Sequence, residues 1–157
     1  MLATLATACG GSDKANTPTP TTPLSPTNPS TIAPAKFCDA AQAAKASADV
    51  QQKLFDAVDP PAAAAIQPAI EDFAGKFAAM NAISPAEIQA DVATLNSAAQ
   101  QLATIVRTNN YDVVAMVSTK EFAALNTTFG SDAYISAQDK FQVFLDTNCG
   151  FTTTPGT

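Results

Sequence analysis

Hydrophobic residues recur every three or four positions through most of the chain after residue 34, a spacing that places them on one face of a helix. The clearest run is Ile88, Val92, Leu95, Ala99, Leu102 and Val106. Three further runs are Ile66, Ile70, Phe73, Phe77 and Met80; Phe37, Ala41, Ala44, Ala48, Phe55 and Val58, with a polar gap at Gln51; and Tyr134, Ala137, Phe141, Phe144 and Leu145. No segment sustains the alternation typical of a strand. The pattern therefore predicts an all-α domain.

Helix-start and helix-stop signals lie between these runs. Ser84-Pro85-Ala86-Glu87 and Ser118-Thr119-Lys120-Glu121 have the form of capping boxes, Asp59 precedes a proline, and Gly130-Ser131 is typical of a stop followed by a new start. Pro68 predicts a kink or a late start in its helix. The predicted helices are 34–58, 61–81, 85–108, 112–127 with a possible break near Ser118, and 132–147. Because the connections are short, we expect an up-and-down antiparallel bundle of four to five helices, preceded by a disordered tether.

The amino-acid composition excludes or disfavours several classes of function for this chain. The chain of 157 residues contains no His, so a Ser-His-Asp or Cys-His catalytic device is excluded within it. Its formal net charge of -6 argues against nucleic acid as a partner, because binding phosphates requires a basic patch. Charged residues make up only 14% of the chain, so amides and hydroxyls must cover much of the surface.

The first 33 residues differ in character from the rest. Residues 10–33 contain five prolines among Thr, Ser, Asn and Gly, a composition that favours an extended, semi-rigid spacer. Before them, Leu5-Ala6-Thr7-Ala8-Cys9 resembles the lipobox of exported bacterial lipoproteins, with the leucine one position earlier than usual. This resemblance implies cleavage after Ala8 and acyl chains on Cys9, which would anchor the chain to a membrane. We expect residues 1–8 to be the remnant of a signal peptide whose start lies upstream.

Two further cysteines, Cys38 and Cys149, fall at the two ends of the helical region. In an up-and-down bundle these points can meet at one end, and an exported protein experiences oxidising conditions. A disulfide is the favoured interpretation, and two buried free thiols are the alternative.

Candidate chemistry is sparse. Glu87 and Asp91 share a helix face and could hold a cation or act as an acid–base pair, although acidic residues are common in the first turns of a helix. The phenylalanines, opposed by many alanines, can interdigitate into a tight core, the favoured reading, or leave a slot for an apolar ligand. We expect no catalytic, metal or cofactor site.

The plan of the chain resembles that of small secreted lipoproteins of actinobacterial type. The likeness rests on Cys9-Gly10-Gly11-Ser12, on Phe37-Cys38 and on Cys149-Gly150. It implies four parts, namely a signal remnant at 1–8, a lipidated cysteine and linker at 9–33, a helical domain at 34–151 and a frayed tail at 152–157. It also implies a location on the outer face of the cell membrane or envelope. The predicted function is a non-enzymatic protein-interaction module with an envelope protein as partner, and the alternative is a carrier or sensor of a lipid or other apolar ligand.

Overall fold

The computed structural model describes residues 35–151, and all regular secondary structure in that range is helical. The helices are α1 (Ala35–Phe55), α2 (Ala63–Ala82), α3 (Gln89–Thr108), α4 (Val113–Val117), α5 (Lys120–Phe129) and α6 (Asp132–Asn148). The predicted signal remnant, the lipidated linker and the frayed tail lie outside the described residues.

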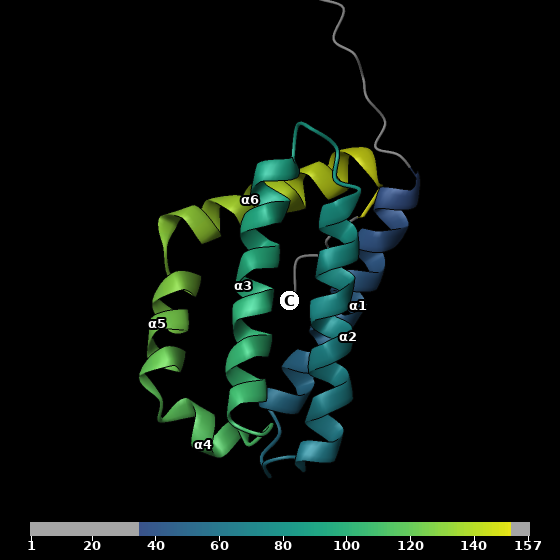
Figure 1. Ribbon diagram of the computed structural model, residues 1–157. Helices are drawn as coiled ribbons and strands as arrows, with labels where there is room; N and C mark the ends of the chain where they lie inside the picture. Colours follow the sequence, from purple (N-terminus) through teal and green to yellow (C-terminus); the bar gives the residue numbers. More distant parts are fainter. Residues whose placement is uncertain (1–34, 152–157) are drawn as a thin grey trace, which may run out of the picture. The chain divides into compact units, whose positions relative to one another are not determined.

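The predicted all-α bundle is confirmed. Helix α1 packs against α2, α2 packs against α3, and α5 and α6 both pack against α3. Figure 1 shows α1, α2 and α3 running up and down beside one another, with α6 lying across their upper ends. The segment predicted at 112–127 divides at Ser118 into α4 and α5, as the possible break anticipated.

The hydrophobic core has two parts, each covered by different late helices. The lower part is buried between α2, α3, α4 and α5 and contains Ile66, Ile70, Phe73, Ala74, Ala99, Leu102, Ala103, Val106, Met116 and Leu125. The upper part joins α1 and α6 to the end of α2 and the start of α3, and contains Phe37, Ala41, Ala44, Met80, Ile88, Val92, Phe144 and Leu145. Each fully buried large side chain contributes roughly 1.5–3 kcal/mol. The two parts together hold the helices in one domain.

The helix starts are where the sequence predictions fail. The predicted box at Ser84 does not form, because the Ser84 hydroxyl donates back to the Met80 carbonyl at 3.0 Å and α3 begins only at Gln89. The second box is shifted by one residue, since Thr119 caps α5 by accepting from the Phe122 amide. Asp59 is no cap, because α2 begins at Ala63. Ser131 caps α6, as predicted, by accepting from the Tyr134 amide at 3.3 Å.

The predicted core positions are mostly buried, with one clear error. The whole run from Ile88 to Val106 is buried. In contrast, Val58 was placed on the core face of the first helix, and its side chain is 99% exposed. The reason is that α1 ends at Phe55, three residues before Val58, so the helical spacing no longer applies there.

Cys38 and Cys149 form a disulfide between the first turn of α1 and the residue that follows α6. Their Cα atoms are 5.5 Å apart, within the usual range for a disulfide. The Phe37 ring packs edge-on against Phe144, with ring centres 5.7 Å apart, directly beside this bond. The disulfide and these rings fasten α1 to α6 at the upper end of the domain.

Candidate functional site

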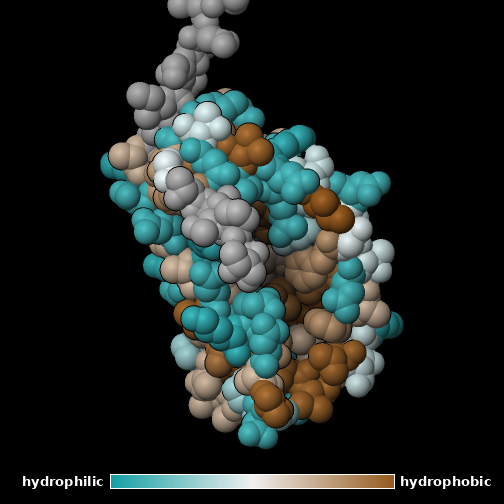
Figure 2. Space-filling model, turned by 180° about the vertical axis from the view of Figure 1, so that it is seen from behind, coloured by the Kyte–Doolittle hydropathy of each residue, from teal (hydrophilic) through white to brown (hydrophobic). Residues whose placement is uncertain are grey.

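A hollow of about 550 Å³ opens on the face of the domain opposite to that seen in Figure 1. We call it the aromatic groove. Figure 2 shows it from outside, with hydrophobic side chains at its bottom. Its lining residues come from α1, α2, α3, the end of α5 and the start of α6: Ala48, Asp49, Gln51, Gln52, Phe73, Phe77, Leu95, Ala99, Leu102, Phe129, Tyr134 and Gln138.

The groove exists because its two walls are held apart by the helices beneath. Helix α1 packs mainly on α2, and α5 packs mainly on α3, so α2 and α3 form the floor between them. Paired rings lie on this surface, with Phe73 and Phe77 4.8 Å apart between centres and Phe129 and Tyr134 5.1 Å apart. The phenylalanines therefore lie in two environments. Around Phe37 the rings pack against one another in the core, whereas Phe73, Phe77 and Phe129 line the groove.

Neutral polar groups line the rim of the groove. Gln51 and Gln52 lie on the α1 side, and Gln138 lies on the α6 side. The only charged lining residue is Asp49, whose carboxylate lies 3.8 Å from the ammonium group of Lys45 on the same helix. The groove therefore offers amides, one phenol and an approximately neutral rim.

Tyr134 sits where the rim meets the apolar floor. Desolvation by the surrounding side chains raises the pKa of its hydroxyl above the ordinary value for tyrosine. The Gln138 amide donates to this hydroxyl at 3.5 Å. Within the described residues the hydroxyl proton itself has no protein acceptor, so it is free to be donated to a bound molecule.

A second apolar surface lies at the opposite end of the domain from the disulfide. We call it the apolar tip and define it by Val58, Pro60 and Pro61 in the loop between α1 and α2, and by Val114 and Val117 on α4. Val58, Val114 and Val117 are 99%, 57% and 53% exposed. Hydrophobic side chains gather at the lower end of the domain in Figure 2.

The tip contains a hollow of about 220 Å³ lined by apolar residues, and acidic residues lie close to it in the sequence. The exposed residues Asp56, Asp59 and Asp112 lie within two positions of its hydrophobic side chains. The nearest cations along the chain are Lys120, three positions after Val117 and 4.0 Å from the Glu121 carboxylate, and Lys53, five positions before Val58. The tip therefore combines an aliphatic centre with a negative rim.

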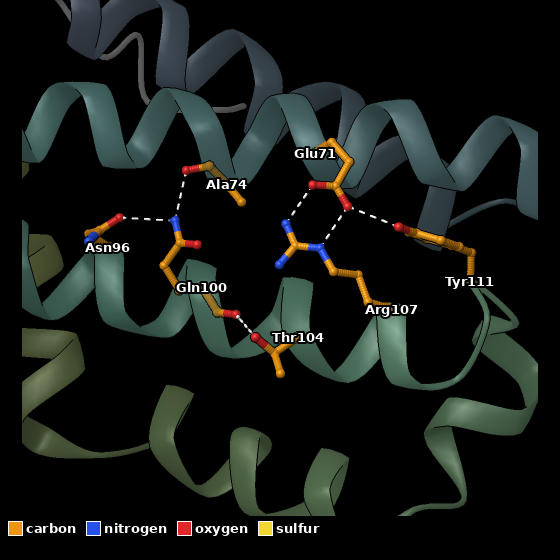
Figure 3. A network of polar contacts seen from close by, with 7 residues as sticks. All are labelled: Glu71, Ala74, Asn96, Gln100, Thr104, Arg107 and Tyr111. Carbon is orange, nitrogen blue, oxygen red and sulfur yellow. Dashed lines mark hydrogen bonds and ion pairs between the residues drawn. The ribbon is translucent and has the colours of Figure 1, made fainter.

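A polar network joins α2 to α3 and to the turn that precedes α4 (Figure 3). The Arg107 guanidinium donates two hydrogen bonds to the Glu71 carboxylate, one of them from Nε to Oε1 at 2.7 Å. The Tyr111 hydroxyl donates to the same carboxylate at 3.0 Å. Asn110 and Tyr111 have positive φ angles, 53° and 61°. These residues follow the end of α3, and the Tyr111 amide donates a hydrogen bond to the Val106 carbonyl.

The hydrogen bond from Arg107 is the largest influence on the pKa of Glu71, and together with the hydrogen bond from Tyr111 and the positive charge of Arg107 it lowers this pKa despite the opposing effect of desolvation. Farther along the same helices, Gln100 donates to the Ala74 carbonyl at 2.8 Å. A carboxylate held ionised in this way fastens helices together and is a poor general acid.

The two carboxylates predicted as candidates lie at the beginning of α3, where both line a shallow hollow beside α6. Glu87 lies in the turn before α3, and Asp91 lies in the first turn of α3. The Asp91 carboxylate accepts a hydrogen bond from Lys140 at 3.3 Å, which joins α3 to α6. Within residues 35–151, no group of three or more potential metal ligands comes together.

Cys9, the predicted lipidation site, lies outside the described residues. Among the helices of residues 35–151, none combines the length and the apolar character needed to cross a membrane. Comparisons of the chain with known protein families, with curated proteins and with solved structures find no match.

The sequence analysis offered a slot beside the phenylalanines only as an alternative, without locating it, and it did not predict the tip, although each surface left a signal. The polar gap at Gln51 interrupts the hydrophobic run of α1 at the position where the groove begins. The signal for the tip is the sequence Asp56-Ala57-Val58-Asp59-Pro60-Pro61, in which an isolated valine stands between two aspartates and precedes two prolines. Such a segment favours a loop, which exposes the valine.

Proposed function

We propose that the chain is an extracytoplasmic lipoprotein, anchored to a membrane through acyl chains on Cys9, whose helical domain acts as a non-enzymatic protein-interaction module of the cell envelope. The observation that carries the proposal is the position of the apolar tip. Helix α1 starts at Ala35, directly after the predicted linker, and runs for 21 residues to the loop that contains Val58. At 1.5 Å per residue, the tip lies about 30 Å from the point where the linker joins the domain.

An exposed hydrophobic cluster on a water-facing surface favours contact with another protein. The acidic rim makes the chemistry of that partner more specific. Because Asp56, Asp59 and Asp112 lie beside the apolar centre, a partner segment with apolar side chains flanked by Lys or Arg would complement it. The same negative rim disfavours contact with a second copy of this tip, since like charges would face each other.

The non-enzymatic part of the proposal draws on Glu71. Hydrogen bonds from Arg107 and Tyr111 lower the pKa of this carboxyl group, whereas a general acid near neutral pH needs a raised pKa.

Photo-crosslinking in the cells that make the protein tests the interaction. A photoreactive amino acid is placed at Val58 or Val117 on the tip, and at Val143 on α6, a control valine that is 64% exposed. We expect one discrete crosslinked protein from positions 58 and 117 and none from position 143. Equal crosslinking from all three positions would show that the tip has no special role.

The anchor is tested separately with an alkyne-labelled fatty acid. The natural chain should incorporate the label and partition with the detergent phase, and the Cys9→Ser variant should lose both properties. Incorporation of the label into Cys9→Ser would contradict lipidation at this residue.

A further inference from the structure

We propose that the aromatic groove is a binding site for an uncharged amphiphile with a single apolar chain or ring system and a hydroxyl or carbonyl head group. This inference is independent of the protein contact proposed for the tip.

The size of the hollow fits a small molecule. Its volume of about 550 Å³ falls within the range of roughly 300–1,000 Å³ found for sites that bind drug-sized ligands. A second hollow of about 190 Å³ adjoins it and shares Ala48, Phe77, Leu95, Tyr134 and Gln138 with it. The two form a continuous trough along the side of α1.

The floor of the trough selects the apolar part of the ligand. Phe77, Leu95 and Leu102 supply aromatic and aliphatic surface, and Phe129 closes one side. Phe73, Leu95 and Leu102 are buried, whereas Phe77 and Phe129 are half-buried, so these two rings provide most of the apolar surface that the floor leaves exposed. Covering it with an apolar chain removes hydrophobic surface from water without any rearrangement of the helices.

The rim selects an uncharged head group. An anionic head would meet only Lys45, which Asp49 already neutralises at 3.8 Å, and a cationic head would meet only Asp49, which Lys45 neutralises. The remaining polar groups of the first hollow are the amides of Gln51, Gln52 and Gln138. The amide nitrogen of Gln52 donates to the Asp56 carboxylate at 2.9 Å and that of Gln138 donates to the Tyr134 hydroxyl at 3.5 Å, which leaves their carbonyl oxygens as acceptors. Together with the Gln51 amide, they complement hydroxyl and carbonyl groups.

Tyr134 would fix the position of the head group. Its hydroxyl lies at the boundary between rim and floor, and its proton has no protein acceptor among residues 35–151. It can therefore donate to a carbonyl or hydroxyl oxygen of the ligand while the ring packs edge-on against Phe129.

The test uses the full chain carrying Cys9→Ser, with the disulfide oxidised, and an uncharged fluorescent dye, Nile red, as the reporter. Monolauroylglycerol, which is uncharged, and dodecanoate, which has the same chain length and a negative charge, are compared as competitors below their critical micelle concentrations. We expect monolauroylglycerol to displace the dye at least tenfold more effectively. Equal or better displacement by dodecanoate would overturn the assignment of an uncharged ligand.

Two tryptophan substitutions locate the site. Ala48→Trp fills the trough from the α1 wall, and Ala46→Trp places the same side chain on the exposed face of the same helix. We expect at least a tenfold loss of affinity for monolauroylglycerol in Ala48→Trp and no change in Ala46→Trp. If Ala48→Trp does not fold, Gln138→Trp on α6 takes its place, with Ala133→Trp as its exposed control. Equal affinity in the filled and control variants would show that binding occurs elsewhere.

Two further variants test the details. Tyr134→Phe should weaken the binding of monolauroylglycerol several-fold and leave the affinity for diphenylhexatriene, a hydrocarbon dye without a hydrogen-bond acceptor, unchanged; an equal loss for both would contradict the role of the hydroxyl. A chain ending at Phe151 should bind as the full chain does. Binding that appears only after this truncation would overturn the proposal by showing that residues 152–157 occupy the groove.

Discussion

The aromatic groove and the apolar tip both expose hydrophobic side chains, but they stand in different relations to the core. The groove is concave, and its floor side chains Phe73 and Leu102 also belong to the lower part of the core. At the tip, Val58 projects from a loop with 99% of its side chain exposed. Solvent exposure alone therefore does not distinguish a surface that serves only binding from one whose side chains also belong to the core. The two can be distinguished by how much stability the domain loses when a side chain on each surface is truncated.

Their rims differ as well. Amides, one phenol and Asp49, whose carboxylate lies 3.8 Å from the Lys45 ammonium group, line the rim of the groove, whereas Asp56, Asp59 and Asp112 lie beside the tip. A neutral rim favours a neutral small molecule, and a charged rim favours a charged partner whose approach depends on salt. Two surfaces of similar hydropathy can thus serve different ligands within one small domain.

Removing the disulfide should have the largest effect, and it should separate the two surfaces. Replacing Cys38 and Cys149 together by Ser frees a loop of 111 residues, which should lower the free energy of unfolding by about 2–5 kcal/mol in urea titrations. The groove should lose affinity because α1 is no longer fastened to α6, while crosslinking from the distant tip should persist. An unchanged urea midpoint would show that the core alone holds α1.

Truncating one side chain on each surface tests the comparison directly. Phe77→Ala should lower the stability by about 2–4 kcal/mol, because Phe77 packs against both parts of the core as well as lining the groove. The matched change at the tip, Val117→Ala, should alter it by less than about 0.5 kcal/mol. Similar losses in the two variants, measured by urea unfolding, would remove the distinction between them.

The Glu71 network, which reaches the turn before α4, should give a smaller, pH-dependent effect on the free energy of unfolding. Because the pKa of Glu71 in the folded chain lies below its ordinary value of 4.5, the ionised carboxylate stabilises the fold above that pH. This contribution is lost as the pH falls through the folded-state pKa. Both side chains of the ion pair are about 40% exposed, so solvent screening limits it to roughly 0.5–1 kcal/mol.

The measurement is the free energy of unfolding at pH 7 and at pH 3 for the natural chain and for Glu71→Gln. The natural chain should be the more stable at pH 7, and the difference should shrink at pH 3. Lys76→Gln, which removes an exposed pair with Asp72 on the same helix, is the control and should show little change at either pH. A constant difference between the natural chain and Glu71→Gln at both pH values would contradict the assigned role of the carboxylate.

The smallest effect on stability is expected from Val58→Ser. Its side chain touches little of the core, so we expect no change beyond about 0.5 kcal/mol in the urea midpoint, together with complete loss of crosslinking from position 117. A loss of stability above 1 kcal/mol would mean that the loop packs on the core in solution, and the tip would then be no free surface.

The sequence by itself determined the helices and most of the core. The three- and four-residue spacing from Ile88 to Val106 is a local property, and burying such a face is the dominant favourable contribution to folding, so the prediction holds. Helix starts were less predictable. The Ser84 hydroxyl could accept a hydrogen bond from a backbone amide of the next helix or donate one to a carbonyl of the preceding helix, and it donates to the Met80 carbonyl.

Only the tertiary structure decided where hydrophobic residues stay uncovered. Phe37 and Phe77 have the same pattern in the sequence, yet α6 covers the first fully and leaves the second beside a groove. The difference comes from the direction of α6, which lies across the upper ends of the bundle rather than along it (Figure 1). Periodicity indicates which face of a helix is apolar, whereas packing between helices distant in the sequence determines how much of that face is buried.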